Sequence, residues 1–346
     1  MEEQLHMSTT NEDSIYIFLS TDNNYSIPAY ITLYSLIYNY RGKKSVKVCI
    51  LASGDLSPEN RHLLSALSDN DSKFTICFID MKDAYNGVTF KLDHLSHAAM
   101  YRLMIPLTAE KLNLKADTCI YLDTDIVVEG DISELYDLDE TLGEYYFAGV
   151  LDPCSFDNTL ADHPARLGIP AMDQYINSGV LLINLKQIRR DRLSNRLEDA
   201  GYRKDYLYND QDAINSVCYG GIKLIPLKFN MMRQFFYHND RYFSEVYSPV
   251  YGKDNTAEAK RSPVVIHYID RQKPWSHRTI LMSEKWWKYV GLQDERTIRE
   301  YITPFIASHR APLSDWLFET AKTILAHMGI YDIVRSAKER LIRGKN

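Results

Sequence analysis

The stretch CIYLDTDI, Cys119–Ile126, gives the strongest indication of the fold and the chemistry that we expect of this chain. A run of apolar, strand-forming residues ends there in two aspartates, Asp123 and Asp125, separated by Thr124. On a strand, successive side chains point to opposite faces, so both carboxylates are predicted to project the same way. Two carboxylates at the end of a buried strand suit a divalent cation such as Mg²⁺ or Mn²⁺. Such a cation most often holds a diphosphate.

The aspartate pair has two other interpretations. A short acid after an apolar run also caps a turn, because its side chain can bond to the nearby backbone. An EF-hand loop over residues 123–134 is excluded, because Val127 offers no oxygen at the fifth position.

The composition is that of a globular protein with an acidic balance. The 346 residues exceed one typical domain, although α/β folds of this size often form one core. Lys and Arg number 40 against 46 Asp and Glu, a net charge of −6, which argues against nucleic acid as a partner. The 25 tyrosines suit sugar-binding surfaces but also fill cores.

The sequence predicts a cytoplasmic enzyme. No apolar run reaches the roughly 18–20 residues that cross a bilayer, and the polar N-terminus lacks an apolar signal region. Cys49, Cys77 and Cys119 lie in apolar, strand-like runs, and the five cysteines follow no spacing pattern. They are therefore expected to be buried free thiols in a reducing compartment.

Strand and helix patterns alternate along the first two hundred residues. Strands are predicted at 14–20, 46–51, 75–79, 148–151 and 180–184, besides the one that ends at the aspartate pair. Helices are predicted at 26–40, 57–68, 97–104, 190–200 and 211–218, with Ser26 and Ser57 as caps. This alternation predicts an α/β fold with a mainly parallel sheet flanked by helices.

In open sheets of this kind ligands bind beyond the carboxyl ends of the strands. Polar residues follow two predicted strands, at 20–24 and 123–125. Neither GxGxxG nor GxxxxGK[ST] occurs, so no glycine-rich phosphate loop is available. A diphosphate would therefore be neutralised by a metal and side chains, which favours the metal interpretation of the aspartate pair.

Five ordered segments together carry a resemblance to a known family. They are FLSTDNNY (18–25), YLDTDIVV (121–128), NSGVLLINL (177–185), NDQDAIN (209–215) and HYIDRQKPW (267–275). On these the chain resembles the family-8 retaining glycosyltransferases, which include glycogenin and bacterial lipopolysaccharide α-galactosyl- and α-glucosyltransferases. The resemblance covers about residues 15–275. It implies the GT-A nucleotide-diphospho-sugar transferase fold.

The resemblance also implies roles for individual residues. Metal ligands would be Asp123, Asp125 and His267, and the neutral imidazole makes Mn²⁺ the expected ion, with Mg²⁺ possible. Nucleotide-binding residues would be Ser20, Thr21, Asp22, Asn24, Tyr25, Asp123, Thr124 and Lys273. Residues around the transferred sugar would be Arg102, Asp152, Asn177, Asp210 and Gln211, the last two also being the catalytic candidates. Asp270 departs from the family pattern, because a small residue commonly stands three positions after the histidine.

The implied reaction is transfer of galactose or glucose from a UDP-sugar to a saccharide or glycolipid acceptor, with retention of anomeric configuration. Retention needs either a carboxylate nucleophile on the opposite face or same-face attack by the acceptor. Gln211 is the family residue nearest the opposite face, and an amide is a poor nucleophile. Same-face attack is therefore favoured, and Asp210 keeps the covalent route open.

The sequence divides into three expected parts: a disordered N-terminus at 1–14, a GT-A catalytic domain at 15–280, and a C-terminal helical region at 281–346. A helix is predicted over 313–343, with one face formed by Leu317, Ala321, Ile324, Leu325, Met328 and Tyr331. From Lys322 onward the sequence has six Lys or Arg and two acidic residues, which gives a local net charge of +4. Such a helix can lie on the inner membrane surface, or it can pack on the domain with a solvated basic end.

Two different classes of protein remain as alternatives. Asp123-x-Asp125-x-Val127 also fits the nucleophile motif of haloacid-dehalogenase phosphohydrolases. That family places the motif on its first strand and follows it with a later acid pair, whereas three strand–helix units precede it here. A sugar-binding module without catalysis is the other alternative.

Overall fold

The computed structural model describes residues 14–87, 96–156, 160–203 and 205–343, with side chains as far as residue 337. The chain divides into two compact units that alternate along the sequence. The first comprises Met1–Ser26, Arg41–Asp123 and Ser133–Leu224, and the second comprises Ile27–Tyr40, Thr124–Ile132 and Ile225–Asn346. Residues 1–13 of the predicted disordered N-terminus lie outside the described residues, and Ser14 is the first residue of a strand. The three-part division by function stays a prediction.

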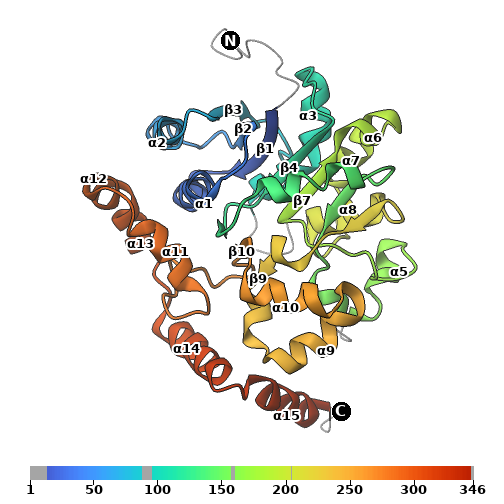
Figure 1. Cartoon of the computed structure of the whole chain (residues 1–346), viewed down its shortest axis with the longest axis vertical. Helices are drawn as coiled ribbons and strands as arrows, with labels where there is room; N and C mark the ends of the chain where they lie inside the picture. Colours follow the sequence, from blue (N-terminus) through green and yellow to red (C-terminus); the bar gives the residue numbers. More distant parts are fainter. Residues whose placement is uncertain (1–13, 88–95, 157–159, 204, 344–346) are drawn as a thin grey trace. The chain divides into compact units, whose positions relative to one another are not determined.

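The first unit contains a sheet in the order β3-β2-β1-β4-β7-β6-β8. Its strands are β1 Ser14–Thr21, β2 Ser45–Ala52, β3 Phe74–Asp80, β4 Thr118–Leu122, β6 Phe147–Gly149, β7 Val180–Asn184 and β8 Ile222–Leu224. The pairs β1–β2, β2–β3, β1–β4 and β6–β8 are parallel, and β7 runs antiparallel to β4 and β6. The prediction of an α/β fold with a mainly parallel sheet is confirmed, and Figure 1 shows β1 to β4 side by side.

The central strands are apolar because they are buried on both faces. Every residue of β1, β4 and β7 is buried, and parallel strands covered by helices read as continuous apolar runs. Cys49 and Cys119 are buried free thiols as predicted, whereas Cys77 is only partly buried.

The strand order reverses between β1 and β4. The chain runs outward from β1 through β2 to β3 and then returns to place β4 on the other side of β1. The carboxyl ends of these two parallel strands are therefore adjacent. Such a switch point is where open α/β sheets bind ligands, and it carries the polar residues after Ser20 and the aspartate after Leu122.

The helices of the first unit are short. They are α2 Pro58–Ser65, α3 Ile105–Lys111, α4 Ser133–Tyr136, α5 His163–Leu167, α6 Leu185–Arg190, α7 Ser194–Ala200 and α8 Asn209–Val217. Further 3₁₀ turns lie at Ala66–Asn70, His97–Met104, Asp139–Thr141 and Pro153–Phe156. Ser57 caps α2 as predicted, because its side chain accepts from the Asn60 N–H. The predicted helix at 190–200 is instead two helices, α6 and α7, since Arg192 between them adopts a left-handed conformation (φ 56°).

The second unit contains a small sheet in the order β5-β10-β9, with β5 Ile126–Val128, β9 Met231–Met232 and β10 Val265–His267. Helix α1, Ser26–Asn39, is bonded to β5 and the residues just before it. The Thr32 hydroxyl reaches the carbonyl oxygens of Thr124 (2.9 Å) and Ile126 (2.8 Å), and the Val128 N–H donates to Ser35 (2.9 Å). This helix therefore fixes the backbone on both sides of Asp125.

The remaining helices of the second unit are α9 Asp240–Tyr251, α10 Lys253–Arg261, α11 Ser283–Val290, α12 Glu295–Thr297, α13 Thr303–Ser308, α14 Leu313–His327 and α15 Tyr331–Arg343. Leu227–Phe229 and Arg233–Tyr237 form 3₁₀ turns, and Ile298–Ile302 forms a π turn. In the described part of the chain, no helix combines the length and the apolar character that crossing a bilayer requires.

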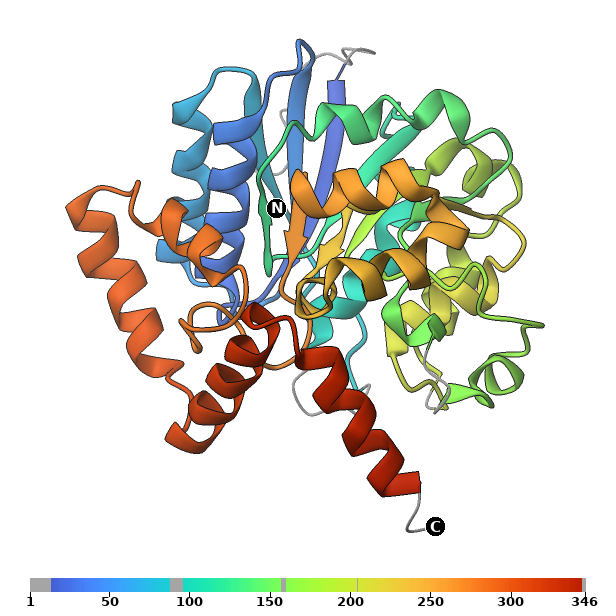
Figure 2. The same ribbon diagram turned by 60° about the horizontal axis from the view of Figure 1, so that its bottom comes forward.

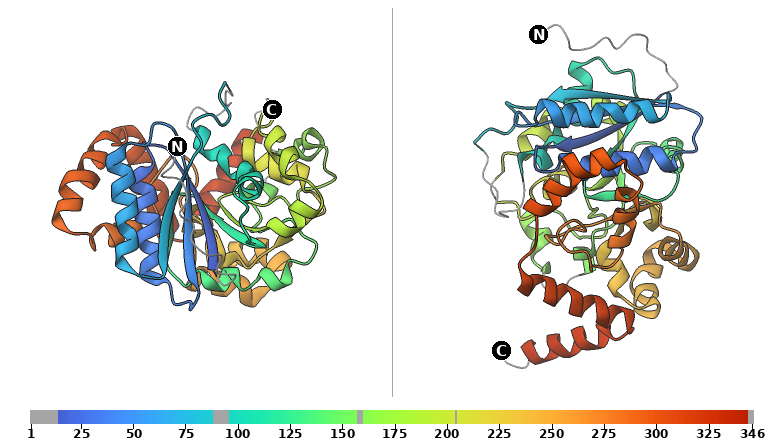
Figure 3. Two further views of the ribbon diagram at one scale, coloured as in Figure 1. Left: turned by 90° about the horizontal axis from the view of Figure 1, so that it is seen from above. Right: turned by 90° about the vertical axis from the view of Figure 1, so that its left-hand side faces the viewer.

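The segment 313–343 is helical as predicted, but it forms two helices and not one, because the chain breaks between α14 and α15 (Figure 2). Gly329 has φ +70°, its N–H donates to the Ala326 carbonyl, and the Ile330 N–H donates to the Leu325 carbonyl. This is the glycine-terminated helix end that left-handed backbone produces. Figure 3 shows the same two helices from two further sides.

The apolar face predicted for this segment is largely exposed. Leu317 is 54% exposed and Met328 64%, whereas the buried positions of α14 are Glu319 and Thr323. The helix is therefore held to its unit by polar contacts, and apolar side chains remain on the outside.

Candidate functional site

Asp125 lies in the second unit between an imidazole and an ammonium group. His267 pairs with Ile126 in the antiparallel β5–β10 ladder, and the Tyr268 N–H donates to the Asp125 carbonyl (3.0 Å). This register brings His267 Nε2 to 3.2 Å from Asp125 Oδ1, while Lys273 Nζ lies 2.5 Å from Asp125 Oδ2. Asp125 is thus in contact with two residues that lie far downstream in the chain.

The other ring nitrogen of His267 has its own partner. Nδ1 lies 3.0 Å from the side-chain oxygen of Asn230, a fully buried residue just before β9. An amide oxygen only accepts, so it requires a proton on Nδ1 and leaves Nε2 as the ring nitrogen that faces Asp125. A histidine oriented in this way is typical of metal ligands.

Asp123 is held within the first unit. The Arg102 guanidinium donates to both of its carboxylate oxygens, at 2.7 and 3.2 Å, and the Tyr121 hydroxyl donates to Oδ1 at 2.8 Å. Strand β4 ends at Leu122, so neither aspartate lies on a strand. The two carboxylates do lie close together, but strand alternation is not the reason, because the pair occupies a bend between β4 and β5.

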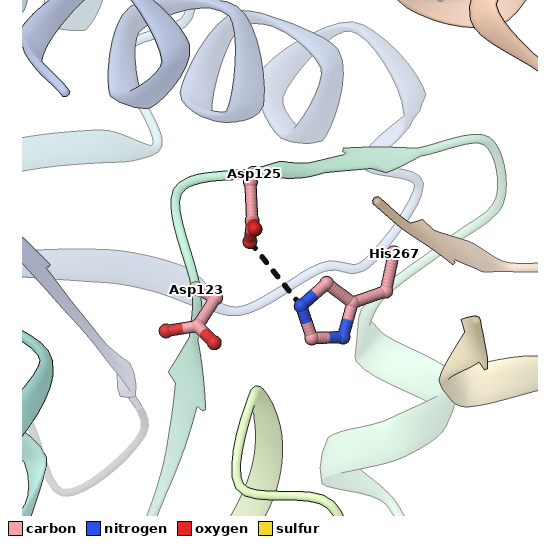
Figure 4. A group of neighbouring side chains, drawn as sticks. All are labelled: Asp123, Asp125 and His267. Carbon is pink, nitrogen blue, oxygen red and sulfur yellow. Dashed lines mark ion pairs between the residues drawn. The ribbon is translucent and has the colours of Figure 1, made fainter. Parts of the chain in front are cut away.

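The two aspartates and His267 nevertheless form one candidate metal group. Each offers one ligand atom, and these atoms all lie within 4.8 Å of one another (Figure 4). The grouping follows from local connections, because His267 is paired with Ile126 and Asp123 precedes that residue by only three positions. Two carboxylate oxygens and a neutral imidazole nitrogen suit a divalent transition metal.

Charge neutralisation keeps Asp125 ionised. Burial alone would raise the pKa of this carboxyl group, but the neighbouring Lys273 and His267 outweigh burial and hold the pKa well below its ordinary value. Asp125 is therefore a carboxylate, the form that binds cations, over the whole working pH range.

Arg102 is only 4% exposed and is surrounded by groups of the first unit. Besides Asp123, its guanidinium contacts the Ser178 carbonyl (2.6 Å), the Ser178 hydroxyl (3.0 Å) and Asp210 Oδ2 (3.1 Å). The Ser178 hydroxyl in turn donates to Asp210 Oδ2 at 2.7 Å. Arg102 therefore links an expected metal ligand to an expected sugar ligand.

The other residues expected around the sugar also share hydrogen bonds. Asn177 Nδ2 donates to Asp152 Oδ2 (3.0 Å) and to Gln211 Oε1 (3.2 Å), and the Ser178 backbone N–H donates to the same Gln211 oxygen (3.2 Å). A backbone N–H only donates, so it identifies the amide oxygen of Gln211 as the atom that faces it. The structure thus brings together all five residues expected around the sugar.

Burial dominates the acidity of Asp210. It raises the pKa of this carboxyl group above its ordinary value, although Arg102 and Ser178 oppose the shift. Asp210 is therefore a weaker acid than an exposed aspartate.

The residues expected to bind the nucleotide follow β1. The Asp22 carboxylate accepts from the Tyr25 N–H (2.9 Å), and the Thr21 hydroxyl donates to the Asp22 carbonyl (3.0 Å). Ser20, Thr21 and Asp22 are buried, Tyr25 is half-buried and Asn24 is exposed. The segment is a turn that leads into α1, and binding of a nucleotide by these residues stays a prediction.

Asp270 has a left-handed backbone, with φ +71°. Glycine tolerates this conformation best, and aspartate is among the few other residues that adopt it. Its carboxylate accepts from Gln234 Nε2 (2.5 Å) and lies 3.8 Å from the Arg233 guanidinium. Aspartate therefore fits this left-handed backbone position, and two neighbours bind its carboxylate.

Four supporting residues were missed by the sequence analysis: Thr32, Tyr121, Ser178 and Asn230. Tyr121 and Ser178 lie inside quoted motifs, at YLDTD and NSG, so their position was a signal that we did not use. Asn230 and Thr32 act across long sequence separations, and no local pattern marks them.

The chain matches a known protein family over most of its length. The model of the family described as glycosyl transferase family 8 matches residues 16–279. The chain is 24% identical over 282 residues to general stress protein A of Bacillus subtilis, covering 78% of this chain and 90% of that one. It is 26% identical over 258 residues to a lipopolysaccharide 1,2-glucosyltransferase of Escherichia coli, covering 73% and 71%.

A solved structure shows the same fold. The galactosyltransferase LgtC, in complex with donor and acceptor sugar analogues, superposes with a TM-score of 0.65 at 24% identity. The match covers 83% of this chain and 99% of that one. The expected GT-A architecture is thereby confirmed.

Proposed function

This chain belongs to glycosyl transferase family 8, and on that premise we propose that it transfers galactose or glucose from a UDP-sugar to a saccharide acceptor with retention. The acceptor would belong to lipopolysaccharide or another surface glycan, the class named for the Escherichia coli relative. The observation that carries the proposal is the group formed by Asp123, Asp125 and His267, with Lys273 beside it. Membership of this family replaces the phosphohydrolase alternative.

The donor atoms present fit Mn²⁺. Asp123 and Asp125 would supply oxygens and His267 would supply Nε2, since Asn230 occupies the other ring nitrogen. A neutral imidazole among the ligands favours Mn²⁺ over Mg²⁺. When bound, the ion would act as a Lewis acid for the charge that develops on the departing UDP.

Lys273 would complement this group as a point charge. Its ammonium group already contacts the Asp125 carboxylate and the Tyr268 carbonyl (2.7 Å). It is therefore held next to the carboxylates that would bind the metal, close to where the diphosphate would lie. From there it can stabilise a phosphate oxygen that gains charge in the transition state.

Retention is proposed to occur by same-face attack. The bond from the anomeric carbon to the UDP oxygen breaks, the acceptor oxygen bonds to that carbon from the same side, and its proton passes to a phosphate oxygen of UDP. Gln211 is a poor nucleophile, and its amide oxygen accepts two hydrogen bonds. Asp210 is paired with Arg102 and Ser178, which disfavours the covalent route through this carboxylate.

The test is a screen of nucleotide sugars with Mn²⁺, with UDP release and donor hydrolysis as readouts. Release from UDP-galactose or UDP-glucose that stops in excess chelator supports the proposal. Equal turnover in chelator would rule out the metal-dependent reaction. A glycosyl adduct on Asp210, trapped with a fluorinated donor and seen by peptide mass spectrometry, would replace same-face attack by the covalent route.

The C-terminal helices are proposed to bind the anionic inner surface of the membrane, which would place a cytoplasmic enzyme at its glycolipid acceptor. Two acids of these helices are turned inward, since Glu319 pairs with Arg233 and Asp332 pairs with His238. The outer side keeps exposed apolar residues, which are Leu313, Trp316, Leu317, Phe318, Ile324, Met328, Ile333 and Val334. Together with the local charge of +4 in the sequence, this is the pattern of an interfacial helix.

Flotation with vesicles that contain anionic lipid tests this assignment. The full chain should float, and the double substitution of Leu317 and Phe318 by Ser should reduce flotation without unfolding the chain. Flotation that is equal with neutral vesicles, or equal in the variant, would contradict an electrostatic and apolar membrane contact.

A further inference from the structure

A buried side-chain donor without a partner lies next to the expected sugar residues. Among the described residues of the first unit, Asn209 Nδ2 is buried and makes no hydrogen bond. Asn209 is 7% exposed and immediately precedes Asp210 and Gln211 at the start of α8. A buried polar group without a partner is uncommon in native proteins, because it has lost its hydrogen bonds to water.

The neighbouring side chains differ from Asn209 in this respect. Asp210 is bonded to Arg102 and Ser178, and the Gln211 oxygen accepts from Asn177 and Ser178. Both are thus held in place by groups of the protein. Of the three consecutive residues, Asn209 is the one that retains an unused buried donor.

The backbone at Asn209 is also held in an unusual conformation, with φ +30°. The two residues before it are bonded to the fully buried carboxylate of Asp212, which accepts from the N–H groups of Leu207 (2.7 Å) and Tyr208 (2.9 Å). The same carboxylate accepts from the Tyr175 hydroxyl (2.5 Å) and is bonded to His163 (2.8 Å). These four contacts fix the turn that precedes α8 and so fix where the Asn209 amide lies.

A second asparagine on the same helix shows the ordinary structural use of this side chain. Asn215 is 1% exposed, its oxygen accepts from the Ile176 N–H, and its amide donates to the carbonyls of Ile176 and Gln211. Its hydrogen bonds are all made within the protein. The contrast indicates that the unused donor of Asn209 is not a general feature of α8.

We propose that Asn209 is a specificity-determining residue whose amide donates a hydrogen bond to one hydroxyl oxygen of the transferred hexose. The inference rests on the proposed function and deepens it, because it assigns discrimination among hexoses to a named donor. A ligand hydroxyl would supply the partner that the buried amide lacks. A hexose without an oxygen at that position would leave the amide buried and unpaired, and the enzyme would reject it.

The test uses the full chain with Mn²⁺ and the better of UDP-galactose and UDP-glucose, together with its 2-, 3-, 4- and 6-deoxy analogues. The wild-type chain should lose about 10- to 100-fold in kcat/KM on one analogue. Asn209→Gly removes the amide while its backbone accepts φ +30° without strain, so this variant should fold. It should lose activity on the parent donor and use that analogue about as well as the parent, with unchanged affinity for UDP.

Asn215→Ala is the matched control. It should lower the melting temperature, because it leaves Ile176 groups unpaired, and keep the preference for the parent donor over the analogue. Asn209→Gly that discriminates as the wild type does, or that weakens UDP binding as much as donor binding, would overturn the assignment. If the wild type releases no UDP from any UDP-hexose, the proposed function itself fails, a result visible before any variant is made.

Discussion

Arg102 holds Asp123 by two hydrogen bonds, 2.7 and 3.2 Å long, from a guanidinium that is almost completely buried. This bidentate pair fixes the orientation of a carboxylate that we expect to bind the metal. Arg102 also reaches Asp210 and Ser178. Arg102 thus positions two carboxylates of the first unit, a role that does not depend on a bound donor sugar.

Arg102→Lys should lower kcat/KM by about 10- to 100-fold, because lysine keeps the charge but cannot bind Asp123 in a bidentate manner. Arg102→Met should in addition destabilise the fold by about 3–5 kcal/mol, since it leaves buried carboxylates without a counter-charge. Steady-state UDP release and denaturant unfolding measure the two effects. Full activity in the lysine variant would remove the positioning role.

Asp125→Asn should reduce Mn²⁺-dependent turnover by more than about 100-fold, because loss of a metal ligand exceeds the loss caused by an outer-shell partner. The asparagine is nearly isosteric, and Lys273 keeps its bond to the Tyr268 carbonyl, so the chain should remain folded. Circular dichroism checks the fold and UDP release checks turnover. A folded variant that turns over normally would exclude Asp125 from the metal group.

Asn230→Ala should weaken activation by Mn²⁺ by about 10- to 100-fold, because the His267 ring loses the acceptor that fixes its tautomer. Asn230→Asp keeps an acceptor oxygen at the same place and should retain most of the activation. The half-saturating Mn²⁺ concentration for UDP release distinguishes the two variants. Equal values in both would show that Asn230 does not orient the histidine.

Asp270→Gly and Asp270→Ala form a pair that separates charge from backbone strain. Both remove a negative charge next to the expected diphosphate, so both should lower KM for the UDP-sugar. Only glycine relieves the left-handed backbone, and the alanine variant should therefore be less stable than the glycine variant by about 1 kcal/mol. Equal stability of the two variants would contradict the effect of backbone strain, and an unchanged KM would contradict the effect of charge.

Acid should loosen α15. Burial lowers the pKa of His238, against the opposing effect of Asp332, while Arg335 and Lys260 favour the same lowering. A histidine with a depressed pKa stabilises the fold above its unfolded value, near 6.5, and loses that contribution as the pH falls through the folded value. Hydrogen-exchange protection factors at 331–337, which are corrected for the intrinsic slowing of exchange in acid, should therefore be high at pH 7.5 and lower at pH 5.5. His238→Gln should abolish the difference, and an unchanged acid response in that variant would exclude His238 as its cause.

The sequence predicted those features that are encoded locally. The apolar runs at Ile15–Leu19 and Cys119–Leu122 predicted buried parallel strands, and the cap of α2 followed from Ser57 and Pro58. His267 was connected to the aspartates only through resemblance to a family. The structure supplies the physical reason, which is the register of β10 against β5.

Other features could not be derived from local patterns. The bond between Asn230 and His267, and the convergence of Arg102 and Ser178 on Asp210, depend on tertiary placement. Periodicity placed Leu317 and Met328 on an apolar face but could not tell whether the protein covers that face. Gly329 is a sequence signal for the end of a helix, but the apolar periodicity alone did not reveal the break there.

The pairing of β10 with β5 bears on how such enzymes diversify. His267 is kept near Asp125 by a three-residue ladder, not by closeness along the chain. Evolution can therefore lengthen, shorten or rewrite surface loops between residues 129 and 264 while the ladder keeps the imidazole in place. An ancestral enzyme with this ladder could acquire new acceptors through changes in its loops, while the residues expected to bind the donor stay in place.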